Sequence, residues 1–400
     1  MNEGALRREL LPYARHAITA EDVQAVVDVL AGTHVAQGPE AAGFEHDLAA
    51  VAGGGHAVSV SSGTAALHVA LLALGVKAGD EVIVPSLTFL STANAVLFCG
   101  ARPVFADVDA ETLTLDPESV AARVTPRTRG VIPVHFAGHP ADTVALADAI
   151  GPGRFVLEDA CHALGATRDG RPAGSLGDAA CFSFHPAKHV TSGEGGAVTC
   201  EDDELAERLR SLRSHGVERR PEHFHGLGLP AALRVEERGP WVYEMHELAP
   251  NYRLAEPAAA LGRSQLRRLG ENLARRREIV AGYHAALADC DLIRLPVERA
   301  GVSSAWHLYA IQLESDALRG GRAEFFAGLR RAGLGVQVHY IPVHLQPWYR
   351  KELGTAWGDL PETERAYLRL LSLPLFPTLE SADVDRVVAA VRDEATRLRR

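Results

Sequence analysis

The chain contains very little lysine. Its 400 residues include 41 basic ones, of which only Lys77, Lys188 and Lys351 are lysines. Any chemistry that needs a side-chain primary amine therefore has three candidates. A basic excess is also missing, because 51 acidic residues give a net charge of −10. Since nucleic-acid-binding proteins present a positive surface, this balance argues against a nucleic-acid partner.

Long apolar runs are absent as well. No stretch reaches the roughly 18–20 apolar residues of a membrane-spanning helix, and residues 1–11 carry charges where a signal peptide would be apolar. The five cysteines are widely spaced and odd in number, which predicts neither a Cys-x-x-Cys metal pair nor a disulfide framework. We therefore expect a cytoplasmic protein without a membrane partner.

Apolar segments of strand length alternate with helical segments over residues 56–213. Their apolar residues are continuous, which is typical of strands buried on both faces of a mostly parallel sheet wrapped by helices. The predicted strands are His56–Val60, Glu81–Val84, Pro103–Ala106, Gly130–Pro133, Phe155–Glu158, Ala180–Phe184 and Ala197–Cys200. The predicted helices are Thr64–Leu74, Thr88–Cys99, Ala141–Ala149 and Asp203–Arg213.

Helical patterns also mark both sides of this region. Thr19 and Asp22 have the spacing of a capping box, and Gly32 is placed to end the helix that follows. A long charged helical stretch is predicted over Leu261–Leu287. We predict a large α/β domain over residues 1–265 and a smaller C-terminal α/β domain over residues 266–400.

Lys188 has the sequence context of a reactive amine. Lys77 lies in a glycine-rich turn and Lys351 in a charged stretch, so both are expected to be exposed. Lys188 follows a predicted buried strand, where desolvation lowers the pKa of an amine and makes it a better nucleophile. The alternative is a structural lysine whose stem lies on apolar surface while its amine reaches water.

Two further features point to a bound cofactor. Glu158 and Asp159 end a predicted strand, where ligands bind in open α/β sheets, and an aspartate there can keep a pyridinium nitrogen protonated. The small-residue turn around Ser62 and Thr64 opens a helix, whose N-terminus can seat a phosphate. Taken singly, these could be a loop-binding carboxylate and an ordinary helix cap. With Lys188, in this order, they predict a pyridoxal-phosphate (PLP) enzyme.

Seven segments extend this interpretation to nearly the whole chain. They are Gln37–Pro39, Ser61–Leu67, Pro85–Asn94, Glu158–Gly165, Ser183–Lys188, Gly193–Gly196 and Asn251–Arg253. In them the chain resembles the DegT/DnrJ/EryC1/StrS family of sugar-nucleotide aminotransferases. The resemblance implies an α/β, fold-type-I PLP-dependent transferase that forms a homodimer with shared active sites.

The resemblance also implies roles for individual residues. Lys188 matches the catalytic lysine that joins the cofactor covalently and then moves a proton, and Asp159 matches the partner of the pyridinium nitrogen. The remaining cofactor-binding residues are expected to be Thr64, Ala65, Phe89, His162, Ser183 and, from the neighbouring subunit, Asn251. The substrate-binding residues are expected to be Tyr13, Asn251, Arg253, His339, Tyr340, His344 and Gln346.

Within the family, the branch of the pseudaminic-acid pathway is most similar, notably over Val336–Gln346. It implies transfer of an amino group from glutamate to C4 of UDP-4-keto-6-deoxy-N-acetyl-β-L-altrosamine. The chain departs from the family at Leu254–Ala258, which leaves dTDP- or GDP-linked keto sugars as alternatives. A sugar 3-dehydratase, with histidine replacing the lysine, is a further alternative because His189 is adjacent. A non-catalytic binding module is the third.

The segment Gly216–Tyr243 is rich in proline, glycine, arginine and histidine and is predicted to be an exposed excursion. The histidines in and beside it could suggest a metal protein. They have no steady ligand spacing and are interleaved with charged residues, so we predict no metal site. These histidines are His215, His223, His225 and His246.

Overall fold

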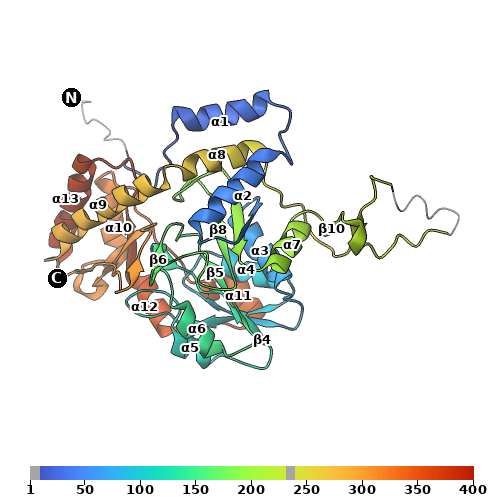
Figure 1. Ribbon diagram of the computed structural model, residues 1–400. Coiled ribbons are helices and arrows are strands. Elements are labelled where there is room, and N and C mark those ends of the chain that lie inside the picture. The colour runs from blue at the N-terminus through green and yellow to red at the C-terminus, as the bar shows by residue number, and fades with distance from the viewer. Residues whose placement is uncertain (1–9, 231–238) are drawn as a thin grey trace.

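A seven-stranded sheet forms the centre of the computed structural model, which describes residues 10–230 and 239–400 (Figure 1). The strand order is β1-β9-β8-β5-β4-β2-β3, with β9 antiparallel to both neighbours and all other pairs parallel. Each predicted strand overlaps one strand of this sheet, which confirms the mostly parallel α/β fold. The strands are β1 (His56–Val60), β2 (Glu81–Pro85), β3 (Arg102–Ala106), β4 (Thr128–Val131), β5 (Phe155–Asp159), β8 (Ala179–Ser183) and β9 (Gly196–Cys200).

Helices cover both faces of the sheet. Val82 and Val84 of β2 join a core with α3, α4 and α7, whereas Ile83 between them joins a core with α5 and α6. Because successive side chains of a strand point to opposite faces, the continuous apolar run reflects burial on both sides. These helices are α3 (Gly63–Ala73), α4 (Ser91–Phe98), α5 (Pro117–Ala121), α6 (Thr143–Ile150) and α7 (Asp203–Leu212).

A second, three-stranded antiparallel sheet with the order β12-β14-β15 has its own core, built with the helices that flank it. The chain between β14 and β15 returns to the first sheet, where Val343, Tyr349 and Leu360 join the core of that sheet. The strands are β12 (Ile293–Arg294), β14 (Tyr309–Leu313) and β15 (Leu370–Leu373). The helices of this half are α9 (Leu269–Leu287), α10 (Gly321–Arg331), α11 (Pro347–Leu353), α12 (Pro361–Arg369) and α13 (Ser381–Leu398).

The prediction of one helix over Leu261–Leu287 is wrong, because α8 (Glu256–Leu266) and α9 are separate helices. Arg268 at the break donates to the Asp22 carboxylate and to the Ala17 carbonyl group. The break lets α8 pack beside α1 (Ala20–Ala31) and α2 (Pro39–Val51), while α9 continues to the second sheet (Figure 1).

The first helix begins and ends as predicted. Thr19 and Asp22 form the capping box of α1, and Gly32 is its C-cap. Three of its apolar residues, Val23, Val27 and Leu30, are 54%, 47% and 60% exposed. The helix therefore carries an apolar stripe that the described residues leave exposed.

The predicted excursion projects from the body of the molecule (Figure 1). Its described parts are largely exposed, and residues 231–238 within it lie outside the described residues. A two-stranded pair joins β10 (Val217–Glu218) to β11 (Glu244–Met245). The remaining short elements are β6 (Thr167–Arg168), β7 (Arg171–Pro172), β13 (Val302–Ser303) and the 3-10 helices at Phe136–Gly138, Pro221–His223, Ser315–Ala317 and Val343–Leu345.

Over the described ranges, no helix is both long enough and apolar enough to cross a membrane. Residues 1–9, which include most of the segment considered above for a signal peptide, lie outside the described residues.

Candidate active site

A cavity of about 400 Å³ lies at the carboxyl ends of β5 and β8 and has Lys188 in its wall. Ligands of open α/β sheets bind at this edge. The cavity brings together residues from distant parts of the chain. The predicted site residues that line it are Tyr13, Thr64, Phe89, Asp159, His162, Ser183, Lys188, His339 and Tyr340.

One end of the cavity is formed by the N-terminus of α3. Ser62 is the N-cap and accepts a hydrogen bond from the backbone N–H of Ala65 at 3.1 Å, while the Thr64 hydroxyl lies 2.7 Å from that of Ser91. Ala65 itself is buried in the first helical turn. A Cβ on Gly196 of β9 would lie 2.3 Å from the Ser62 carbonyl oxygen, so only glycine permits this close approach. The helix end and its hydroxyl groups suit a phosphate.

Asp159 lines the cavity, and two hydrogen bonds fix the position of its carboxylate. Its Oδ2 accepts a 2.7 Å hydrogen bond from the Thr92 hydroxyl, and its Oδ1 accepts the backbone N–H of Cys161 at 3.3 Å. The Thr92 hydroxyl in turn lies 2.8 Å from that of Thr88. Asp159 is only 5% exposed, so this orientation is fixed by the surrounding protein.

The neighbouring Glu158 points to the other face of the sheet and does not line the cavity. Its carboxylate accepts three backbone N–H bonds of 2.7–3.0 Å from the loop over residues 174–177. It also lies 2.8 Å from Nε2 of the buried His135. The two adjacent acids therefore differ in role. Glu158 binds a loop, which is the alternative that the sequence analysis gave for these two carboxylates.

Lys188 is the only lysine of the chain that lines the cavity. Its side chain is half-buried, and burial lowers the pKa of its amine below 10.5. Lys77 and Lys351 are exposed, as predicted. His189 is buried with Nε2 2.9 Å from the Ala305 carbonyl oxygen and does not line the cavity. This placement favours Lys188 over His189 as the residue that meets a ligand.

His162 lines the cavity, and one of its two ring nitrogens has no hydrogen-bond partner among the described residues. Its Nε2 lies 3.1 Å from the Tyr340 hydroxyl, and its ring centroid is 4.4 Å from that of His307. Its Nδ1 is buried without a hydrogen-bond partner. Burial lowers the pKa of His162 well below its usual value, which keeps the imidazole neutral. Such an orphaned nitrogen is available to a ligand.

Five predicted residues do not line this cavity: Ala65, Asn251, Arg253, His344 and Gln346. Asn251 is exposed and forms a bridge with Ser214, and Arg253 donates to the Ser214 hydroxyl at 2.5 Å. Arg253 lines a separate cavity of about 470 Å³. Gln346 is half-buried at the N-cap of α11 and lines neither cavity.

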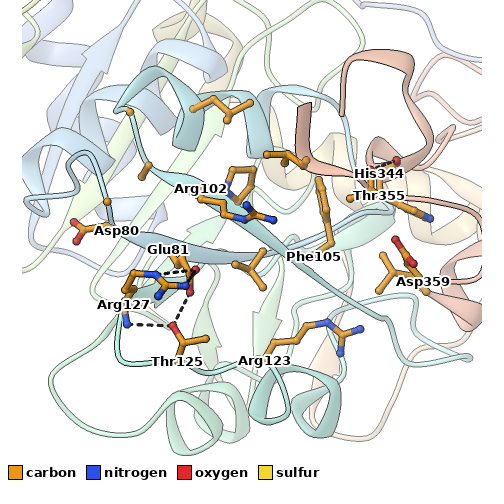
Figure 2. A pocket seen from close by; sticks show the side chains of 18 residues that line it. Asp80, Glu81, Arg102, Phe105, Arg123, Thr125, Arg127, His344, Thr355 and Asp359 are labelled. Atoms are coloured by element: carbon orange, nitrogen blue, oxygen red, sulfur yellow. Dashed lines mark hydrogen bonds and ion pairs between the residues drawn. The ribbon is translucent and has the colours of Figure 1, made fainter. Parts of the chain in front are cut away.

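His344 lies in the wall of a different cavity of about 1040 Å³ (Figure 2). Its ring is fully buried, with Nδ1 2.7 Å from the Ser86 hydroxyl and Nε2 3.1 Å from Glu364. Figure 2 shows this cavity along β3, from the Glu81–Arg127 ion pair at the amino end of β2 to Phe105 and His344. Both ring nitrogens of His344 already have protein partners, so this structure does not bring it to the Lys188 cavity, and its sugar contact stays a prediction.

Several residues of the cavity were missed by the sequence reasoning, and Thr92 and His307 are the two whose contacts matter most for the site. Thr92 lies in the matched segment Pro85–Asn94, and its spacing from Thr88 on the same stretch could have indicated a shared face. His307 comes from the second half of the chain and has no local sequence signal. Its place beside His162 depends on the tertiary fold.

The donor set fits PLP. A helix end with hydroxyl groups suits its phosphate, Asp159 its ring nitrogen, the free Nδ1 of His162 a ring oxygen and Lys188 its aldehyde. A mostly parallel sheet with these groups at its carboxyl edge defines a fold-type-I PLP-dependent enzyme. The chain belongs to the DegT/DnrJ/EryC1/StrS aminotransferase family, whose family model matches residues 16–392. It is thus a PLP-dependent sugar aminotransferase by family.

Similar proteins agree with this assignment. The spore coat polysaccharide biosynthesis protein SpsC of Bacillus subtilis is 42% identical, over 97% of both chains. The solved structure of DesV from S. venezuelae is 39% identical, with a TM-score of 0.83 over 95% of both chains. PseC of Helicobacter pylori, an aminotransferase of pseudaminic acid biosynthesis, is 27% identical, with a TM-score of 0.88 over 98% of this chain and all of its own.

The cofactor is also given by a solved relative. A sugar aminotransferase of Streptococcus pneumoniae has a structure in the PLP form, with 28% identity and a TM-score of 0.88. The similarity covers 97% of this chain and 99% of that one.

Proposed function

We propose that this aminotransferase transfers the amino group of glutamate to C4 of a nucleotide-linked 4-keto-6-deoxy sugar. The observation that carries the proposal is the placement of a single lysine, Lys188, in one cavity with Asp159 and the N-terminus of α3. The preferred substrate is UDP-4-keto-6-deoxy-N-acetyl-β-L-altrosamine, as in the pseudaminic-acid pathway. The resemblance over Val336–Gln346 and the similarity to PseC support this choice.

A dTDP- or GDP-linked keto sugar is the second candidate. SpsC and DesV share more identical residues with this chain than PseC does, and neither name carries pseudaminic acid. The sugar nucleotide is therefore the least constrained part of the proposal.

In this mechanism, bound PLP supplies an electron sink for the carbon that carries the nitrogen. Asp159, held by Thr92, keeps a positive charge stable at the ring nitrogen. The Lys188 amine, whose pKa burial lowers, takes up and returns the proton at the substrate carbon. The neutral His162 offers Nδ1 to the ring oxygen, and Tyr340 holds its other nitrogen.

The sugar would enter past Tyr13, His339 and Tyr340. Tyr13 and His339 have ring centroids 5.4 Å apart, and Nδ1 of His339 lies 2.8 Å from the Ser372 hydroxyl. Phe89 lines the same cavity and is 57% exposed, which suits a side chain that covers a bound ring. Because both substrates use one cavity in turn, ping-pong kinetics are expected.

The proposal includes a homodimer in the cytoplasm. Asn251 and Arg253 lie outside the Lys188 cavity of their own chain, which agrees with their delivery to a partner's site. The exposed stripe on α1 supplies apolar surface that a second copy could cover. All five cysteines are free, as expected in a reducing compartment.

The test is product analysis with a panel of UDP-, dTDP- and GDP-linked 4-keto-6-deoxy sugars and glutamate. Mass spectrometry is expected to show exchange of a keto oxygen for an amino group, and the Lys188→Arg variant is expected to be inactive. Loss of a hydroxyl group without gain of nitrogen would identify a dehydratase instead. Absence of any absorbance change when PLP is added would favour the non-catalytic binding module.

A further inference from the structure

A cluster of potential metal ligands lies outside the active site, in the excursion. It consists of His225, Glu244 and His246, whose ligand atoms all lie within 4.8 Å of one another. Glu244 is buried on β11, whereas both histidines are exposed. The three side chains are not adjacent in sequence: His225 and Glu244 are 19 positions apart. The fold of the excursion therefore brings them together.

Backbone groups fix the carboxylate of this cluster. Glu244 Oε2 accepts the backbone N–H of His225 at 2.6 Å, and Oε1 accepts that of Gly226 at 2.7 Å. The pairing of Glu244 with Glu218 on β10 holds the backbone beneath it. Hydrogen bonds of this kind orient metal-binding carboxylates in known sites.

The two imidazole rings share one orientation. Their centroids are 4.3 Å apart and their planes differ by 3°, and Nε2 of His246 lies 2.8 Å from Glu244 Oε2. Nitrogens of both rings thus lie beside one carboxylate oxygen. Mg²⁺ and Ca²⁺ prefer sets made only of oxygen ligands, whereas two histidines and one carboxylate form a common Zn²⁺ set with an open fourth position.

We propose that His225, Glu244 and His246 bind one Zn²⁺ ion, with water in the fourth position. The ion would link His225 to β11, two described parts of the excursion that are distant in sequence. The base of the excursion is already held by the bridge between Ser214 and Asn251. Because a metal that joins distant segments stabilises the fold that holds its ligands, the proposed role of the ion is to hold these two parts together.

The test measures Zn²⁺ binding by the full-length, tag-free holoenzyme. Equilibrium dialysis with elemental analysis is expected to find one tight Zn²⁺ per chain. The variants His225→Ala and His246→Gln are expected to bind it at least about 10-fold more weakly. Glutamine at 246 can still donate to Glu244, so this variant preserves the local hydrogen bond. His223→Ala is the matched control, because His223 pairs with Glu218 outside the cluster.

A second measurement separates this site from any metal bound near PLP. Zn²⁺ is expected to slow proteolysis between residues 226 and 243 in the wild-type protein and the control, but not in His246→Gln. The absorbance of bound PLP is expected to stay the same in all variants. Wild-type Zn²⁺ affinity in both cluster variants, or no stoichiometric Zn²⁺ in the wild-type protein, would overturn the proposal.

Discussion

Lys188 and Asp159 reach one cavity from neighbouring strands, since Asp159 ends β5 and Lys188 follows β8. Sequence reasoning could identify both, because Asp159 stands at the end of a buried strand and Lys188 follows shortly after the end of another. It did not identify the side chain that positions the Asp159 carboxylate, which is Thr92. Thr92 has no charge, and its importance depends on the 2.7 Å hydrogen bond to a residue 67 positions away.

Thr92→Val is expected to lower kcat about 10-fold, because a hydrogen bond to a charged group contributes roughly 1.5–3 kcal/mol. The KM for glutamate is expected to change little, since Thr92 acts through Asp159. Steady-state kinetics and the pH dependence of the PLP absorbance measure both effects. Thr88→Val is the control, because its hydroxyl contacts Thr92 and not Asp159. Equal losses in the two variants would argue against a positioning role.

In the proposed mechanism the Lys188 amine would have to be unprotonated to react with the aldehyde of PLP. Burial lowers its pKa below 10.5, so the fraction of reactive amine becomes large at a lower pH than for an exposed lysine. The rate of covalent PLP capture by the apoenzyme is expected to rise with pH, with a midpoint below 10.5. Stopped-flow absorbance measures this rate, and Nα-acetyl-lysine is the reference. A midpoint equal to that of the reference would contradict the inferred desolvation.

At the scale of elements, the strands were predictable and one helix boundary was not. Continuous apolar runs of strand length that alternate with helical segments indicate strands buried on both faces, and each of the seven predicted strands overlaps a strand of the sheet. At the break between α8 and α9, Arg268 donates to the Asp22 carboxylate, 246 positions away. No local pattern in Leu261–Leu287 carries that information.

Glu158 ties β5 to the loop over residues 174–177 and to His135. Glu158→Gln is expected to lower the free energy of unfolding by about 3 kcal/mol, because it removes a buried charge that several donors require. Denaturant unfolding of the apoenzyme followed by circular dichroism measures this change. Glu201→Gln, at an exposed position, is the control and is expected to leave stability unchanged. A loss below about 1 kcal/mol would show that the carboxylate is dispensable.

At the scale of the whole molecule, the nine predicted residues that line the cavity come from segments spread over Tyr13–Tyr340. The fold brings these residues together in one cavity, and the family resemblance was what predicted that they share a site. His344 is a residue that the resemblance predicted for the site but that does not line the Lys188 cavity. It is four positions from Tyr340, yet its ring is fully buried against Ser86 and Glu364 and lines a different cavity from Tyr340. Contact with a site cannot be inferred from proximity in sequence to a residue that lines it.

Whether one chain holds a complete active site is also a question about the whole molecule. Asn251 does not line the Lys188 cavity of its own chain, and in the proposed dimer each site combines Lys188 of one copy with Asn251 of the other. Lys188→Ala and Asn251→Ala are each expected to be nearly inactive as homodimers. After the two are unfolded and refolded together, half of the dimers are mixed, and each mixed dimer has one intact site. Aminotransferase activity is then expected to recover to about 25% of the wild-type value, with native mass spectrometry confirming the mixed species. If mixed dimers form and stay inactive, both residues act within the same chain and the shared site is wrong.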